Sequence, residues 1–177
     1  MPSFYYANNT LSSAVGPLYR LKAESSLFRG EKLRLKDINA KTVALLSLNK
    51  LHKIETKDSI GKVLNTTMGV YANTTTVTVI KKGAKNGAST FYHLVWDGSS
   101  ANITKNVASV AHMDSIGTEQ NLCFRIHVSA HEDALFMLSV FLSAMAFNGF
   151  FAEKAVDKNL ESHLAGTSSR IQVIALC

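Results

Sequence analysis

The sequence predicts a mainly β protein in which an antiparallel meander closes as a β-barrel around a central hydrophobic α-helix, followed by a C-terminal amphipathic helix. Two observations carry this prediction. Segments of alternating apolar and polar residues recur about every 8 to 12 residues before residue 129, as in barrels and sandwiches. Residues 134–151 then form an uncharged run whose apolar side chains would face every direction of a helix. Such a helix must be surrounded by protein or by lipid, and a sheet closed around it meets that need.

Alternation at period two, the pattern of a half-buried strand, marks residues 17–22, 31–36 and 51–55. In the clearest example, Leu33 and Leu35 alternate with three cations, Lys32, Arg34 and Lys36. The segment 74–80 is dense in β-branched residues, which suit a pleated surface. The strand candidates of this part are residues 4–6, 17–22, 31–36, 42–48, 51–55, 62–64, 68–71 and 74–80.

A hairpin is predicted around Asn86 and Gly87, because these residues tolerate the positive φ angles of tight turns. It joins residues 77–82 to residues 90–96. Further strand candidates follow at residues 101–105, 107–111 and 122–128, and the last of them runs directly into the long helix.

The start of the helix carries the signals of a capped N-terminus. We expect Ser129 as the N-cap, Glu132 as its capping-box partner, and Asp133 in the first turn, where the helix dipole favours anions. Asn148 and Gly149 form the expected C-terminal stop.

The uncharged run of residues 134–151 has 18 residues, or about 27 Å of helix, whereas a bilayer core needs about 20 residues. We therefore favour burial in protein, with a membrane segment as the alternative. Residues 151–164 can form an amphipathic helix, and residues 170–177 a short strand or tail. The expected organisation is a barrel domain at 1–150 and an extension at 151–177.

The net charge of +6 and the pI of about 9.4 favour anionic partners, such as lipid headgroups or nucleic acid. Because side chains alternate along a strand, Lys32, Arg34 and Lys36 share one face and make a platform for phosphates. Three more cations around the predicted hairpin would add a basic rim: Lys81, Lys82 and Lys85. The competing interpretation of both groups is an ordinary solvated strand face or turn.

The order of these elements resembles the tubby C-terminal-like superfamily, which includes tubby proteins, phospholipid scramblases and the plant LURP-one-related proteins. The matching residues are 124–128, the final strand, and 132–138, an acidic helix start followed by the apolar run. Residues 18–22 and 32–48 fit the opening hairpins, so the resemblance covers roughly residues 3–150. It implies a β-barrel around a hydrophobic helix, and in tubby proteins basic residues on a strand bind phosphoinositide headgroups. Residues 151–177 extend beyond the family's usual end.

No pattern in the sequence indicates catalysis, and we expect a protein that is not an enzyme and uses no cofactor or metal. His127 and His131 are four residues apart, but a strand and a helix cap hold them, which does not suit shared metal ligation. Cys123 and Cys177 give no disulfide framework, and Cys123 is expected to be a small buried side chain. Without a recognisable signal peptide, a cytoplasmic protein is expected, peripheral to a membrane if lipid is its ligand.

The favoured function is a non-enzymatic, tubby-like binding module that contacts anionic membrane lipid of the phosphoinositide type through the basic strand face. One alternative is a structural or self-assembling protein, a homo-oligomer formed through residues 151–177. A second is a scramblase-like membrane protein that uses residues 134–151 as its membrane segment. Nucleic-acid binding is disfavoured, because no stacking aromatic residues are interleaved with the cations.

Overall fold

The computed structural model of the chain describes residues 2–24, 32–47, 53–58, 60–72, 75–83, 87–97, 99–117 and 123–147. These residues form twelve strands and one helix. The predicted amphipathic helix and the final strand or tail lie outside the described residues, so assembly through residues 151–177 stays a prediction.

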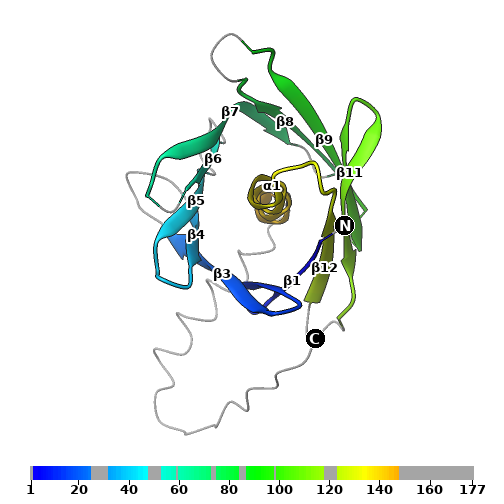
Figure 1. Ribbon diagram of the computed structural model, residues 1–177. Helices are drawn as coiled ribbons and strands as arrows, with labels where there is room; N and C mark the ends of the chain where they lie inside the picture. Colours follow the sequence, from blue (N-terminus) through cyan, green and yellow to red (C-terminus); the bar gives the residue numbers. More distant parts are fainter. Residues whose placement is uncertain are drawn as a thin grey trace, which may run out of the picture.

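The strands form one closed antiparallel barrel, in which each strand pairs with its neighbours in the sequence and β1 pairs with β12 (Figure 1). This confirms the prediction of a mainly β protein whose meander closes. The strands are β1 Ser3–Ala7, β2 Thr10–Ser13, β3 Gly16–Glu24, β4 Lys32–Asp37, β5 Thr42–Ser47, β6 Lys53–Lys57, β7 Val63–Ala72, β8 Thr76–Lys81, β9 Thr90–Trp96, β10 Ser100–Lys105, β11 Ala108–Ser115 and β12 Cys123–Val128.

Three strands differ from the sequence-based prediction. The strand expected at residues 107–111 is β11, which begins at Ala108 and extends to Ser115, so that Val107 belongs to the turn before it. The strand β2 was not expected, since Leu11 is its only large apolar side chain; Leu11 is nevertheless buried, and Asn8 and Asn9 provide the positive φ angles of the turn before it. Residues 62–64 and 68–71, expected as separate strands, both fall in the ten-residue β7, apart from residue 62. A register shift between Thr67 and Gly69 interrupts the ladder of β7 with β8, but the strand continues through it.

The helix α1 spans Ala134–Phe147, and its side chains from Phe136 to Met145 are buried. It packs against strands β5 to β9 and against β12, and Figure 1 draws it in the middle of the ring of strands. The two polar residues in this apolar stretch are satisfied within the helix: Ser139 Oγ donates to the carbonyl of Leu135 and Ser143 Oγ to that of Ser139, at 2.7 and 2.9 Å. Among the described residues, no helix combines the length and apolar character needed to cross a membrane.

The prediction for the start of α1 was wrong, because Asp133 caps the helix instead of Ser129. Asp133 Oδ1 accepts a hydrogen bond from the backbone N–H of Phe136 at 2.9 Å, and its carbonyl accepts the first helical bond, from Met137, at 3.0 Å. Ser129 lies one turn earlier, where its carbonyl accepts a bond from the N–H of Glu132 at 3.1 Å. Glu132 and Asp133 therefore precede the first turn.

One end of the barrel is distinguished by the chain's entry into α1. Because strands alternate in direction, every link from an even-numbered strand to the next strand lies at this end, together with the link from β12 to α1. We call it the helix-entry end. Its described residues are the turns at 14–15, 38–41, 58 with 60–62, and 106–107, the β8–β9 link at 82–83 and 87–89, and residues 129–133.

Candidate functional site

The outer face of β4 carries the three cations predicted to share it. Lys32, Arg34 and Lys36 alternate with Leu33 and Leu35, which are buried in the barrel interior. The charged side chains are therefore held on the outside by the burial of their neighbours.

The neighbouring strand β3 brings two further cations to this face. In the antiparallel register, Arg20 lies directly opposite Lys36, and Lys22 lies directly opposite Arg34. Residues in such pairs have Cβ atoms about 4.5–5.5 Å apart, so four positive charges occupy a small area. We call Arg20, Lys22, Lys32, Arg34 and Lys36 the basic face. Sequence reasoning missed Arg20 and Lys22, because their proximity to β4 depends on the register of the two strands.

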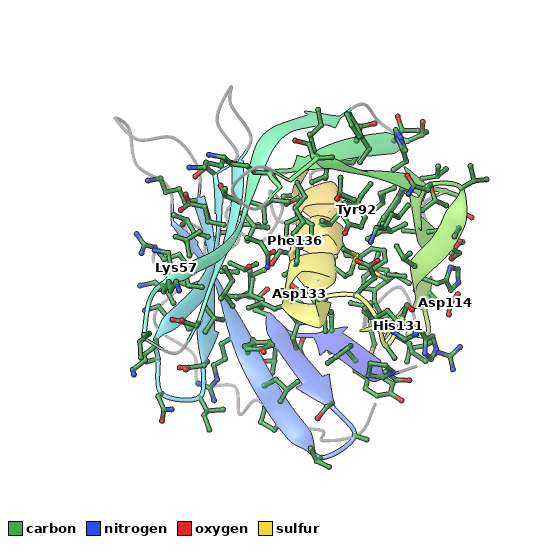
Figure 2. The ribbon with its side chains drawn as sticks, turned by 45° about the horizontal axis from the view of Figure 1, so that its top comes forward. Lys57, Tyr92, Asp114, His131, Asp133 and Phe136 are labelled. Atoms are coloured by element: carbon green, nitrogen blue, oxygen red, sulfur yellow. The ribbon has the colours of Figure 1, made fainter. Side chains whose placement is uncertain are left out.

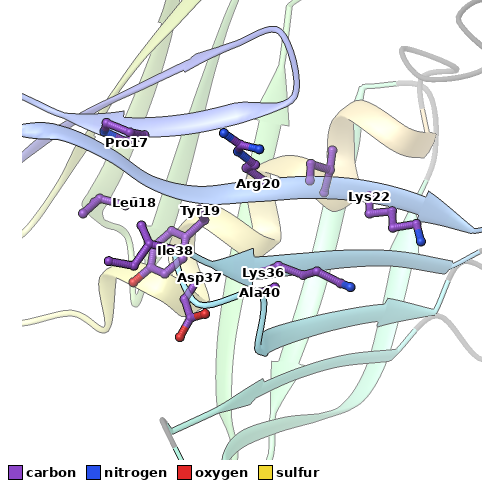
Figure 3. A pocket seen from close by; sticks show the side chains of 10 residues that line it. Pro17, Leu18, Tyr19, Arg20, Lys22, Lys36, Asp37, Ile38 and Ala40 are labelled. Atoms are coloured by element: carbon purple, nitrogen blue, oxygen red, sulfur yellow. The ribbon is translucent and has the colours of Figure 1, made fainter.

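A surface cavity of about 480 Å³ adjoins the basic face at its helix-entry end. Figure 3 shows Arg20 and Lys22 on β3 and Lys36 on the adjacent β4, all lining this cavity. Apolar side chains, among them Leu18 and Ile38, line it as well. Among the residues that the structure describes, no acidic side chain forms an ion pair with Arg20 or Lys36. Asp37 lines the cavity too, and its Oδ1 accepts two backbone N–H groups of its own turn. The lining therefore combines three cations, one carboxylate and apolar surface, and its excess of positive charge suits an amphiphilic anion.

Lys81 and Lys82 lie elsewhere, at the mouth of the barrel on the helix-entry end. Strands β5, β6 and β7 separate β8 from β4, so these lysines do not extend the basic face. Both line a second cavity of about 600 Å³, together with Lys105, His131 and Glu132. Lys85 lies outside the described residues. The structure thus divides the predicted set of cations into two separate groups.

Hydrogen bonds tie this mouth to the start of α1; Figure 2 labels two of the residues involved, Tyr92 and Asp133, beside the helix. Glu132 accepts hydrogen bonds from Tyr92 Oη at 2.9 Å and from Lys105 Nζ at 2.8 Å. Asn65 Nδ2 donates to Asp133 Oδ2 at 2.7 Å and to Thr56 Oγ1 at 2.9 Å. The charge of Lys105 is therefore already matched within the protein.

Tyr92 acts as a neutral donor in this network. Burial raises the pKa of Tyr92 well above its usual range, and the hydrogen bond and charge of Glu132 raise it further. Lys81 Nζ lies 4.9 Å from the centre of the Phe136 ring, which places the lysine over the first turn of α1. These contacts give the mouth a clear structural role, to fix where α1 begins.

His127 and His131 lie in different environments and do not share a binding partner among the described residues. His127 is on β12, with its Nδ1 3.0 Å from Ser3 Oγ, whereas His131 is exposed in the turn before α1. Cys123 is buried, as expected, and Cys177 lies outside the described residues.

A second outer face, on β11 and β12, shows the opposite pattern of charge. Asp114 lies directly across from Arg125, and its Oδ2 accepts a bond from Arg125 Nη2 at 3.4 Å. Its other oxygen is 2.6 Å from His112 Nε2. We call His112, Asp114 and Arg125 the paired face, since its charges compensate one another.

Comparisons of the chain with protein-family models, curated proteins and solved structures found no match. The tubby-like resemblance therefore stays a prediction, and the function has to be inferred from the geometry of the site itself.

Proposed function

We propose that this protein is a non-enzymatic binding module that contacts anionic membrane lipid, of the phosphoinositide type, through the basic face. One observation supports this above the others: the register sets Arg20 against Lys36 and Lys22 against Arg34, beside a cavity that three of these cations line. Cross-strand pairs of cations beside a cavity distinguish the basic face from the other groups of cations in the sequence.

Like charges directly across two strands destabilise a sheet, so this arrangement costs some folding free energy. A phosphate bound between Arg20 and Lys36 offsets that cost, because it attracts both of them. Arginine adds a planar fork of donors that matches phosphate oxygens in pairs. A headgroup with several phosphates would engage more of the face than a single carboxylate can.

The apolar part of the cavity favours a lipid over a free inorganic anion. Leu18 and Ile38 lie beside the cations, where they would contact the glycerol backbone or the first carbons of the acyl chains. Burial of such carbons contributes roughly 0.8 kcal/mol per CH₂ group. A lipid headgroup therefore uses both kinds of lining, whereas free phosphate uses one.

The proposal also includes the tubby-like arrangement in which the barrel closes around α1 as its filling. The buried side chains of α1 and its packing against strands on several sides support this part. A filled barrel has a rigid wall, so the cations on β3 and β4 would be held in place before the ligand arrives. Preorganisation of this kind lowers the ordering cost of binding.

A sedimentation assay with vesicles tests the proposal. Wild type and Arg20→Glu are compared on vesicles that contain a phosphoinositide and on vesicles with phosphatidylserine at equal total charge. The matched control is Arg125→Glu, which makes the same charge change at an exposed arginine of the paired face. We expect Arg20→Glu to lower phosphoinositide binding by about tenfold, or ~1.4 kcal/mol, and Arg125→Glu to leave it nearly unchanged. Equal losses in the two variants would refute the site.

A further inference from the structure

The helix-entry end carries four large aliphatic side chains that point into solvent at the tips of hairpins. Their exposed fractions are 95% for Val15, 80% for Ile38, 85% for Ile60 and 96% for Val107. They sit in four different turns, which join β2 to β3, β4 to β5, β6 to β7 and β10 to β11. The other exposed large hydrophobic residues among those described reach at most 56%. We call these four residues the tip residues.

Two of the tip residues are held by turns of the same construction. Asp37 Oδ1 accepts the backbone N–H groups of Asn39 and Lys41, both at 2.9 Å, around Ile38. Asp58 Oδ1 likewise accepts those of Ile60 and Lys62, at 3.0 and 2.9 Å. Each turn closes on an exposed lysine, Lys41 or Lys62. The turns are thus ordered by their aspartates, and each presents an isoleucine beside a cation.

The turn that holds Val107 is strained in a way that the fold does not require. Asn106 and Val107 have φ angles of 50° and 71°, as a two-residue hairpin of this type needs. Glycine suits such a position, but positive φ is a steric outlier for a β-branched residue. At the opposite end of the barrel, the turn at Asn8 and Asn9, with φ of 48° and 59°, uses asparagine in both places. Val107 is almost fully exposed and gains little packing in return, which points to a use outside the protein.

We propose that the helix-entry end docks on the interface of an anionic lipid bilayer, with the tip residues inserted between the headgroups. Val15, Ile38 and Ile60 follow one another two strands apart, or roughly 10 Å at ~4.8 Å per strand, and Val107 is four strands from both Ile60 and Val15 around the closed barrel. Between them lies the polar mouth with Asn65, Glu132 and Asp133. Apolar points so separated do not form the continuous core of a protein interface, but a fluid bilayer accepts each of them singly.

The charges at this end agree with an anionic surface. The described segments that link strands or lead into α1 here, with their flanking strand residues, contain six lysines and four acidic residues. Asp37 and Asp58 accept N–H groups within their turns, and Glu132 and Asp133 are bonded in the mouth. The lysines of the turns at Ile38 and Ile60 are exposed, where they can meet lipid phosphates.

This orientation deepens the proposed function and rests on it. Ile38 lines the same cavity as Arg20 and Lys36, so a bilayer that receives this tip would bring its headgroups to the basic face. The tips would set the depth and angle of docking, and the basic face would select the headgroup.

Site-directed fluorescence tests the docking surface. Each tip residue is replaced in turn by cysteine in a Cys177→Ser background and labelled with an environment-sensitive dye; Cys123 is buried in the folded protein. The matched control is Asn9→Cys, at the opposite end of the barrel. On vesicles of phosphatidylcholine, phosphatidylserine and a phosphoinositide, we expect blue-shifted emission at all four tips and none at Asn9. Unshifted tips on vesicles that still bind the protein would overturn the inference.

The same vesicles separate the two proposals from each other. If the tips shift but Arg20→Glu binds phosphoinositide like wild type, end-on docking stands and the headgroup site fails. If Arg20→Glu loses binding while the tips stay unshifted, the headgroup site stands and end-on docking fails. A protein that associates with none of the vesicles refutes both.

The strained turn gives a second, independent measurement. We expect Val107→Gly to raise the thermal midpoint of unfolding, because it relieves the strain, and to weaken vesicle binding several-fold, because it removes a tip. The control Asn9→Gly changes a turn of the same type at the far end and should leave vesicle binding unchanged. If Val107→Gly binds vesicles as tightly as wild type, Val107 is not part of a docking surface.

Discussion

The basic face and the paired face are both outer surfaces of neighbouring antiparallel strands, but they differ in which charges lie across from each other. On β11 and β12, Asp114 stands across from Arg125 and also contacts His112. On β3 and β4, arginine and lysine stand across from each other. The first surface sets opposite charges across from each other, whereas the second sets Arg20 across from Lys36 and Lys22 across from Arg34, next to a third pair in which Glu24 stands across from Lys32.

This difference shows which surface has something to gain from a ligand. An exposed opposite-charge pair contributes up to about 1 kcal/mol to a sheet, and a like-charge pair costs a similar amount. A sheet selected for stability alone would resemble the paired face. At the pair Arg20 and Lys36 the sheet lacks such a contribution, and under the proposed function a bound anion would supply it.

The largest expected effect concerns the interior that both faces share. Leu138 is fully buried in α1, so Leu138→Ala should lower the free energy of unfolding by about 2–5 kcal/mol, through lost burial and the cavity left behind. Chemical denaturation measures this loss. The phosphoinositide preference of the folded protein should be unchanged, because neither face is altered; a changed preference would mean that the helix packing shapes the ligand site.

A smaller effect separates stability from binding at the two faces. Lys36→Glu places a carboxylate across from Arg20 and should stabilise the protein by about 0.2–1 kcal/mol, while it weakens phosphoinositide binding. Arg125→Glu places a carboxylate across from Asp114 and should destabilise it by a similar amount, with binding retained. Denaturation midpoints and vesicle sedimentation give the two quantities. If Lys36→Glu lowers both stability and binding, the like-charge explanation of the basic face is wrong.

Much of this fold could be predicted from local patterns, because alternation fixes which side of a strand faces the core. For this reason the sequence alone predicted that Leu33 and Leu35 face the interior of the barrel from β4. The partner of β4 could not be resolved residue by residue, since the opposition of Arg20 and Lys36 depends on the register of two strands joined by a longer link. Charge and spacing alone therefore found three of the five residues of the basic face.

The N-cap of α1 is a second feature that local sequence patterns could not decide. Ser129 and Asp133 are both good N-cap residues, and local preference does not decide between them. The choice depends on distant partners: Asn65 on β7 holds Asp133, and Tyr92 and Lys105 hold Glu132 away from a capping-box role. Contacts between residues far apart in the sequence also placed Lys81 and Lys82 at the mouth, away from β4.

The smallest expected effect is a pH dependence confined to the paired face. Burial alone would raise the pKa of Asp114, but the hydrogen bond and charge of His112, together with those of Arg125, outweigh it and hold that pKa below its usual value. A carboxyl with a lowered folded pKa stabilises the protein above its unfolded pKa of about 3.9, and this contribution is lost as the pH falls through the folded pKa. We therefore expect wild type to exceed Asp114→Asn in stability near neutral pH by about 0.5 kcal/mol or less, since the pair is partly exposed. We expect this gap to close as the pH falls through the lowered folded pKa of Asp114. Urea midpoints of the two proteins across this range measure the gap. A difference that stays constant with pH would show that Asp114 acts through its shape and hydrogen bonds and not through its charge, and the contrast between the two faces would then rest on the basic face alone.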